Sequence, residues 1–568
     1  MVFQKYQTAR SSFAQEIADL AGRPECVEQL MQENVIYILK GLLTDVSLSI
    51  QQNAAIAVGK LASHSAEIAE LLDKEDVLRT LVYVNIERPN RYLKRASLNS
   101  LRSIVKHNAA LARSVVEMGG LELILGCMEE FDAAVKEAAA FVLGYIARQD
   151  LTLALAVVGS GCVPLLVLCL QEPEVNVRVV STSALADIAK HSEDTAQSVI
   201  DAGAIPHLVR ATSNLDTRLK RQALYALAAI AKHSLYMAET VMEAEIFPLV
   251  LEHAGHTDEY IRKAACSLVK EIVKHSPELA QMVVEAGGLG VLVNSVIKNK
   301  GENRLPAILA LGFIAGHTPA LGLSVIYSKG VDALSMALEE EFQTHVGAAA
   351  AWALGHIGRH SVEHAKTITS EGLLQRILDL YMSKGSTEEM KDKAKQALKM
   401  ILLRTDDLES IQPMLDVAPM KILKYIIAQY SKILPNNPAA RRAFVSSGGL
   451  RKVQELIASD ATAEDALLRE HVMLINACFP PDIINYFSPD YPQTLLDRVE
   501  QFKPTLNIDP GLWTDRLFSD TKIPSEIKEE ILALQKAMQL EETQAAATPA
   551  DNANNGAKRG SNPVDKKK

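Results

Sequence analysis

The sequence predicts an all-α protein that forms a right-handed superhelical solenoid of stacked repeats, followed by a non-repeat C-terminal segment. One observation is a histidine that returns at intervals of 42 or 43 residues in motifs such as IAKHS, at His64, His107, His191, His233, His275, His317 and His360. Gln149 stands in this place in the repeat between His107 and His191. A second observation is an apolar residue that opens another stretch, with six successive intervals of 42 residues from Leu121 to Leu373. A fixed period of about 40 residues with helical spacing inside it is typical of a helical solenoid.

Each repeat is predicted to contain a short helix, a second helix and a long third helix. After the histidine, a hydroxyl residue and an acidic first turn, as in Ser276-Pro277-Glu278, favour the start of the first helix. Glycines between the first two helices tolerate positive φ and end the first helix. In three repeats a proline falls where the second helix begins, and its missing N–H costs nothing there: Pro164, Pro206 and Pro248.

Three columns of residues recur along the third helix. One contains Val58, Leu101, Leu143, Leu185, Leu227, Val269, Leu311 and Leu354. Three residues later lie Leu61, Ile104, Ile146, Ile188, Ile230, Ile272, Ile314 and Ile357. Small residues stand four places before the first column: Ala54, Ser97, Ala139, Ser181, Ala223, Ala265, Ala307 and Ala350. This spacing places the apolar columns on one face and predicts a continuous core with closely approaching helices.

This three-helix pattern resembles the armadillo repeat, since AGAIPHLV followed by QALYALAAIA is near the consensus of that family. Regular repeats are predicted over residues 1–380 and degenerate armadillo-like repeats over 381–480. A proline- and aromatic-rich cap or docking segment is predicted over 481–543, with a helix over 524–543. Residues 544–568 lack large apolar side chains, and we expect them to be disordered.

The composition limits the classes of function and partner that we expect for this protein. The net charge of −10 makes general attraction to nucleic acid or to an anionic membrane unexpected. No apolar run approaches the length of a membrane span, and no signal peptide opens the chain. The six cysteines form no CxxC pair and fall on apolar faces, as reduced core thiols do in a cytosolic protein.

No catalytic or cofactor motif stands out. The sequence contains no Walker loop, GxSxG, HExxH or dinucleotide fingerprint, so we expect neither an enzyme nor a bound cofactor. The repeated histidine could suggest metal sites, but neighbouring third helices lie about 8–10 Å apart. We therefore expect these histidines to satisfy carbonyl groups at the ends of third helices.

A cation recurs every 42 residues near the start of the third helix, at Lys94, Lys136, Arg178, Lys220, Arg262 and Arg304. In four repeats an acid precedes it by four residues, which predicts i, i+4 pairs: Asp132, Glu174, Asp216 and Asp258. Around Lys94 and Arg304 the cations outnumber the acids. These two clusters are predicted to contact an acidic partner, and they comprise Arg88, Arg91, Lys94, Arg95, Arg102, Lys298, Lys300 and Arg304. The alternative is a merely solvated face.

The groove positions argue against one armadillo function. Nuclear-import adaptors carry a Trp with an Asn four residues later. Here those pairs are Ile56/Lys60, Asn99/Ser103, Phe141/Tyr145, Ser183/Asp187, Tyr225/Ala229, Ser267/Glu271, Leu309/Phe313 and Trp352/His356. With one Trp and no Asn in its place, an import adaptor is disfavoured.

Longer stretches resemble one group within the armadillo family. FQKYQTARSSFAQEIADLAGRPECVEQL, EEFDAAVKEAAAFVLGYIAR, AAAAWALGHIGRHSVEHA and SPDYPQTLLDRV look like armadillo-repeat proteins of the ciliary and flagellar central apparatus, the sperm-associated antigen six type, over residues 3–503. The resemblance implies a non-enzymatic scaffold in the axoneme that binds a central-pair microtubule, directly or through other subunits, and neighbouring central-apparatus proteins, and is needed for motility.

Two other functions stay open at this point: a cytosolic adaptor that binds acidic or phosphorylated peptides, and an import adaptor. We also hypothesise that residues 400–520 cap the stack or pair with a second copy of the chain, because an uncapped solenoid end exposes core surface.

Overall fold

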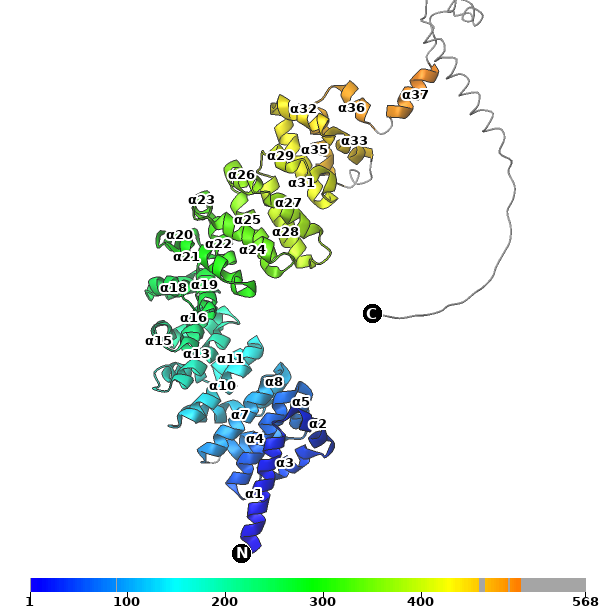
Figure 1. The fold of residues 1–568 in the computed structure, drawn as a ribbon. Coiled ribbons are helices and arrows are strands. Elements are labelled where there is room, and N and C mark those ends of the chain that lie inside the picture. Colours follow the sequence, from blue (N-terminus) through cyan, green and yellow to red (C-terminus); the bar gives the residue numbers. More distant parts are fainter. Residues whose placement is uncertain (1, 88, 459–464, 489–490, 502–568) are drawn as a thin grey trace, which may run out of the picture. The chain divides into compact units, whose positions relative to one another are not determined.

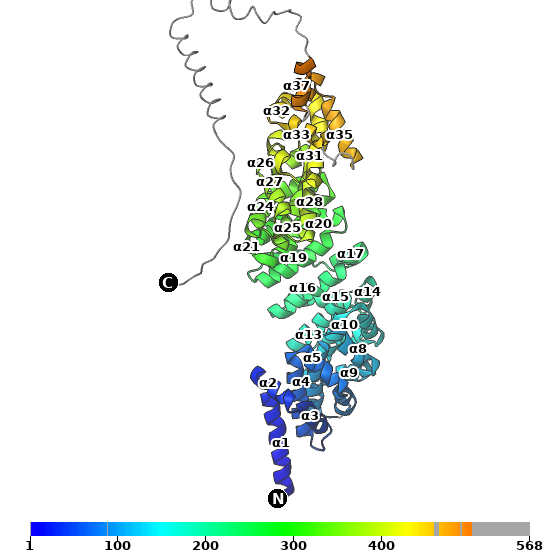
Figure 2. The same ribbon diagram turned by 90° about the vertical axis from the view of Figure 1, so that its right-hand side faces the viewer.

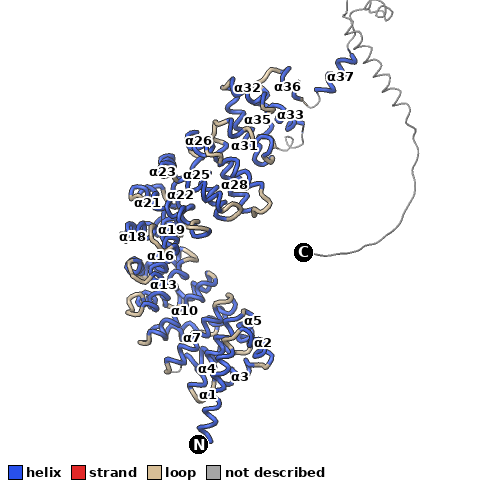
Figure 3. The backbone as a smooth tube through the Cα atoms, in the orientation of Figure 1, coloured by secondary structure: helices blue, strands red, loops and turns tan. Residues whose placement is uncertain are grey.

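The computed structural model describes residues 2–87, 89–458, 465–488 and 491–501. The chain divides into two units, Met1–Pro489 and Asp490–Lys568. The described residues form helices and connecting turns without any strand (Figure 3). No single helix in this part is long and apolar enough to cross a membrane, although three bent helix pairs would pass on length and composition if each were taken together. The predicted helix over 524–543, the predicted disorder over 544–568 and Arg88 lie outside the described residues.

The first unit contains nine consecutive three-helix repeats within its described residues (Figures 1 and 2). The first helices are α2 (Pro24–Gln32), α5 (Ala66–Lys74), α8 (Ala109–Glu117), α11 (Leu151–Gly159), α14 (Glu193–Asp201), α17 (Leu235–Glu243), α20 (Pro277–Glu285), α23 (Pro319–Tyr327) and α26 (Val362–Ser370). The second helices are α3 (Val35–Leu43), α6 (Val77–Thr80, extended by a π-helix over Leu81–Ile86), α9 (Gly120–Met128), α12 (Cys162–Cys169), α15 (Ala204–Thr212), α18 (Phe247–Ala254), α21 (Gly288–Lys298), α24 (Gly330–Glu340) and α27 (Leu373–Met382). The third helices are α4 (Leu48–His64), α7 (Arg91–Val105), α10 (Ala133–Gln149), α13 (Val175–Ala189), α16 (Thr217–Ala231), α19 (Glu259–Val273), α22 (Leu305–His317), α25 (His345–Gly358) and α28 (Glu388–Leu402).

The predicted core columns of the third helices are confirmed. All sixteen residues of the two apolar columns, from Val58 and Leu61 to Leu354 and Ile357, are fully buried. The small residues four places earlier, from Ala54 to Ala350, are also fully buried, and each third helix packs on the next. The core is therefore one continuous apolar layer between successive repeats.

The predicted helix boundaries have a local physical basis. Gly119, Gly203 and Gly287 have φ of 78°, 75° and 78° directly before second helices. Asn34 and Lys329 hold the same left-handed conformation in other repeats, with φ of 56° and 61°. The start of the first helices follows the predicted capping, since Ser65 and Ser276 Oγ accept hydrogen bonds from the N–H groups of Ile68 and Leu279, both 3.2 Å long.

Additional helices flank the nine repeats. Helix α1 (Val2–Leu20) packs on α4, as a preceding third helix would, and its Ala18 carbonyl accepts a 2.7 Å hydrogen bond from Lys60 Nζ. After α28, α31 packs on α28 and α35 packs on α31, which continues the row of third helices. The helices of this end are α29 (Leu408–Ile411), α30 (Met414–Val417), α31 (Met420–Ile433), α32 (Pro438–Ser446), α33 (Gly449–Ala458), α35 (Ala466–Asn476) and α36 (Pro481–Phe487). Short 3₁₀ turns cover Gly301–Asn303 and Leu434–Asn436, and the second unit begins with α37 (Tyr491–Gln501).

The cysteines provide a direct test of this packing. All six are free, and four of them, Cys127, Cys162, Cys169 and Cys266, are buried. Burial raises the pKa of the Cys127 and Cys266 thiols to about 11 and that of Cys162 to about 12. Because the thiolate is the reactive form, we expect only Cys26 and Cys478 to react with a disulfide reagent at pH 8 in the folded protein, and all six after denaturation. Rapid modification of more than two thiols in the folded protein would contradict this packing.

Candidate functional site

The repeated histidines join each repeat to the preceding one. Each imidazole Nε2 lies 2.6–2.9 Å from a carbonyl oxygen near the end of the preceding third helix: that of Ala21, Ala62, Ala147, Ala189, Ala231, Val273 or Ala315. Gln149 makes the same contact, donating from Nε2 to Val105 O at 2.7 Å. The predicted capping role is therefore confirmed, and the carbonyl belongs to the preceding repeat.

The described part of the chain contains no group of three or more His, Cys, Asp or Glu side chains placed to hold a metal ion. The His360 and His364 rings lie 5.5 Å apart, but both Nε2 atoms bond to backbone carbonyls, those of Ala315 and Pro319. These two rings are therefore already engaged in structural contacts.

Three of the six recurring cations form ion pairs between repeats and not along their own helices. Lys94 pairs with Glu130, Lys136 with Glu172, and Arg304 with Glu340, and each acid lies 36 residues after its cation. The predicted i, i+4 pairs are wrong, because in the described residues no ion pair joins Lys136, Arg178, Lys220 or Arg262 to the acid four residues earlier. The acid four residues before Lys136, Asp132, instead caps α10 by accepting hydrogen bonds from Ala134 and Val135 N–H.

Asp216 and Asp258 cap α16 and α19 in the same way. A carboxylate one residue before a helix satisfies N–H groups that have no partner within that helix, and capping therefore accounts for these three aspartates. Glu174 stands in the same place before α13 but makes no capping hydrogen bond.

The prediction that the cluster around Arg304 contacts a partner must be corrected. The Arg304 side chain is buried, and it donates to the carbonyl oxygen of Asn299 at 2.6 and 2.9 Å as well as to Glu340. It was predicted as a partner contact, but it is a structural residue that holds the turn after α21. Lys298 and Lys300 are exposed, and neither forms an ion pair within the described residues.

Only some cations of the cluster on α7 are free to contact a partner. Lys94 is committed to Glu130, and its side chain is only 14% exposed. Arg91 and Arg95 are exposed, with Arg91 3.4 Å from the Asp132 carboxylate and its side chain 60% exposed. Arg102 lies over the ring of Phe141, 4.6 Å from its centre. The cations of α7 that are available to a partner are therefore Arg91, Arg95 and the outer part of Arg102.

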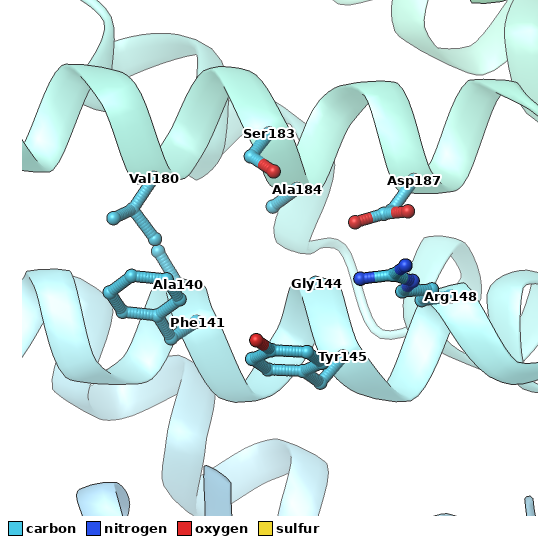
Figure 4. A pocket seen from close by; sticks show the side chains of 9 residues that line it. All are labelled: Ala140, Phe141, Gly144, Tyr145, Arg148, Val180, Ser183, Ala184 and Asp187. Atoms are coloured by element: carbon cyan, nitrogen blue, oxygen red, sulfur yellow. The ribbon is translucent and has the colours of Figure 1, made fainter. Parts of the chain in front are cut away.

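Small hollows separate neighbouring third helices along one face, which we call the third-helix groove. One of them, of about 60 Å³, lies between α10 and α13 (Figure 4). It is lined by Phe141, Tyr145 and Arg148 of α10 and by Ser183 and Asp187 of α13, and the side chains of Arg148 and Asp187 point toward each other. A second hollow, between α4 and α7, is lined in part by Ile56, Lys60, Asn99, Arg102 and Ser103. The predicted groove pairs therefore line these surfaces.

Trp352 is enclosed by its neighbours in this groove. Its ring centre lies 5.1 Å from that of Phe313 and 4.3 Å from that of His356. Burial, followed by the nearby Arg359, His360 and His317, lowers the pKa of His356 to about 4, so this ring is neutral near pH 7. These contacts occupy the indole and leave less of it available for stacking on a ligand.

Basic residues stand directly before the repeated histidine or its glutamine counterpart, and one of them, Arg148, lines the hollow between α10 and α13. Five successive repeats carry a cation there, which we call the edge row: Lys106, Arg148, Lys190, Lys232 and Lys274. Lys190 and Lys274 also contact acids, with Lys190 Nζ 2.8 Å from Asp187 and Lys274 Nζ 2.5 Å from Glu271. Lys106 and Lys232 donate hydrogen bonds to carbonyl oxygens of the preceding repeat, those of Ser63 at 3.3 Å and Lys190 at 2.7 Å.

Comparison with known proteins agrees with this architecture. The armadillo/beta-catenin-like repeat model matches residues 192–232, which contain the three helices of one repeat, α14 to α16. The chain has the armadillo-repeat fold. A crystal structure of an engineered protein superimposes with a TM-score of 0.60 at 23% identity, covering 78% of this chain and 98% of that one, and supports the fold alone.

Two curated relatives match part of the sequence. Human sperm-associated antigen 6 is 47% identical over 174 residues, which are 31% of this chain and 33% of that protein. Mouse sperm-associated antigen 6 is 48% identical over 171 residues, 30% of this chain and 33% of that protein. The resemblance to this type of protein is therefore confirmed. The matched part spans about a third of the length of these relatives and is shorter than the expected range 3–503.

Proposed function

We propose that the protein is a non-enzymatic scaffold of the ciliary or flagellar axoneme, where it binds a central-pair microtubule and neighbouring central-apparatus proteins and supports motility. The observation that carries this proposal is the similarity of an armadillo solenoid to sperm-associated antigen 6. The architecture suits a scaffold, because stacked repeats present a long surface and each repeat contacts only its neighbours.

The surface proposed to meet a microtubule is the basic part of the third-helix groove. Arg91, Arg95 and Arg148 supply its exposed positive charge. The four lysines of the edge row are half-buried, and two of them, Lys190 and Lys274, are already paired with acids. The chain as a whole has a net charge of −10, so it can bind an acidic partner only where its cations are segregated. Lys298 and Lys300 remain a second, smaller candidate contact.

Reversal of charge at Arg91 and Arg95 is expected to weaken microtubule binding. The Arg91→Glu/Arg95→Glu variant should bind stabilised microtubules at least about tenfold more weakly at low salt, since both side chains are exposed and charge complementarity acts over a Debye length of about 10 Å. Co-pelleting at two salt concentrations measures this change.

A matched control is Lys366→Glu/Lys384→Glu, which alters the net charge equally at two other exposed positions. It should bind like the wild type. Equal affinity of the Arg91/Arg95 variant and the wild type would remove this surface from the proposal.

The axonemal location is tested independently by expressing the tagged full chain in ciliated cells. Signal confined to the axoneme, and lost together with the central pair in cells that lack it, would support the proposal. A diffuse cytosolic signal would favour the alternative of a cytosolic adaptor for acidic peptides.

The prediction that residues 400–520 cap the stack or pair with a second copy stays a prediction. Large apolar side chains are exposed at this end of the first unit, among them Val417, Leu467, Met473 and Tyr486. The test is truncation at about residue 400, and a truncated chain that stays soluble, cooperative and unchanged in mass state would exclude this role.

A further inference from the structure

The ion pairs that connect the recurring cations to the next repeat are interrupted in the middle of the stack. Glu130, Glu172 and Glu340 each lie 36 residues after their cations and pair with them. The residues 36 positions after Arg178, Lys220 and Arg262 are Asn214, His256 and Lys298, so the carboxylate is missing in three successive repeats. Arg262 bonds to Asn299 instead, whereas Arg178 Nε is buried without a hydrogen-bond partner.

Arg178 consequently lacks a charged partner. Among the residues that the structure describes it forms no ion pair, and its Nε–H group is buried without a hydrogen-bond partner. An unsatisfied buried donor destabilises the fold, and more so when the group is charged. Such a group indicates a place where a bound acceptor would be stabilising.

Arg178 lies in a cavity of about 340 Å³ between two repeats. The cavity is lined by residues of α13, α15, α16 and the turns that follow α12 and α15, and none of them is a carboxylate: Leu170, Gln171, Arg178, Thr182, His207, Arg210, Ala211, Asn214 and Leu219. Asn214 Oδ1 accepts a 2.9 Å hydrogen bond from Asp216 N–H, which leaves the amide NH₂ group as a donor. Two guanidinium groups and several neutral donors therefore line one cavity without a balancing acid.

We propose that this cavity binds the phosphate group of a phosphorylated side chain on a partner protein. Arginine favours phosphate through charge-assisted, often bidentate hydrogen bonds. Donors from α13, α15 and the turn at Asn214 suit a tetrahedral anion with several acceptor oxygens. The site is separate from the third-helix groove, and its existence does not depend on the axonemal role.

The test is calorimetric titration of the full chain with inorganic phosphate at fixed ionic strength. We expect saturable binding to the wild type. The affinity should fall at least about tenfold in Arg178→Gln, because this substitution removes a charge-assisted hydrogen bond to the phosphate. Lys136→Gln is the matched control, because Lys136 occupies the same position of the preceding repeat and is paired with Glu172. This control should bind phosphate like the wild type.

A second variant distinguishes the site from general effects of phosphate on protein stability. Asn214→Glu places a carboxylate where Glu130 and Glu172 stand in the preceding repeats, and we expect it to pair with Arg178. It should raise Tm in the absence of phosphate and abolish phosphate binding. The proposal would be overturned by unchanged binding in Arg178→Gln or Asn214→Glu, by absence of binding to the wild type, or by acetate binding as tightly as phosphate.

Discussion

Replacement of Gly355 by alanine is expected to destabilise the protein strongly. Gly355 lies on α25, and a Cβ atom at this position would lie 2.6 Å from the Cα atom and 2.9 Å from the Cβ atom of Ala397 on α28. Because the first of these is a backbone atom, neither a rotamer change nor a small side-chain shift relieves the overlap, and the two helices must separate. Overpacking of this kind costs about 1–3 kcal/mol and occasionally more. Urea or thermal denaturation measures the loss.

Gly126→Ala is the matched control for this substitution. Gly126 lies within α9, and a Cβ atom there would have no neighbour within 4 Å. Alanine at an open helical position should stabilise by about 0.5–1 kcal/mol, because it restricts the unfolded chain and favours the helix. If Gly355→Ala and Gly126→Ala changed stability in the same direction, the close approach of α25 and α28 would be contradicted.

Mild acidification is expected to destabilise the stack through the histidines that join its repeats. Burial lowers the pKa of His191, His233, His275 and His360 below the ordinary value of 6.5, although the hydrogen bond of each ring to a carbonyl partly opposes this. Neighbouring lysines at 190, 232 and 274 lower the pKa further, whereas Asp187, Glu193 and Glu271 raise it.

Since the pKa is lower in the folded chain, the unfolded chain binds more protons as the pH falls below about 6.5. The contribution of these histidines to the stability of the fold is therefore fully present above about pH 6.5. It is lost as the pH falls toward the pKa values that the histidines have in the folded chain. We expect Tm to fall between pH 7.5 and pH 5.5, a range that lies above the ordinary titration of carboxylates.

A variant with His191, His233 and His275 replaced by glutamine isolates this effect. Gln149 already makes the same interrepeat hydrogen bond, so glutamine should preserve the contact while removing the titrating group. The variant should fold at pH 7.5 and show a smaller decrease in Tm on acidification. Retention of the full wild-type pH dependence would assign the effect to other groups.

The repeat architecture could be predicted from the sequence because its signals are local and repeated. The columns from Val58 to Leu354 and from Leu61 to Ile357 specify one buried face, and each repetition confirms the others. Left-handed positions were expected only at glycine, yet Asn34 and Lys329 adopt the same conformation, which the surrounding helices impose. Glycine recurs at the position of Gly355 in other third helices, at Gly59, Gly144 and Gly312, but arginine, alanine or lysine stands there in the remaining repeats, so the close approach at Gly355 is seen only in the structure.

The binding surface was less predictable because it depends on which side chains meet between repeats. Arg304 looked like an uncompensated surface cation, but Glu340, 36 residues away, and the Asn299 carbonyl enclose it. The missing acid opposite Arg178 was equally hidden, since Asn214 becomes significant only when the ion pairs of neighbouring repeats are known. Pairing between repeats, and not charge density along the chain, decides which cations are free.

The central functional proposal is tested most directly by co-pelleting the purified full chain with stabilised microtubules that are intact or stripped of their acidic tails. The proposal predicts salt-sensitive binding to intact microtubules, and weaker binding to stripped ones if the basic groove engages the tails. Absence of co-pelleting at low salt with both kinds of microtubule would contradict direct binding through this surface.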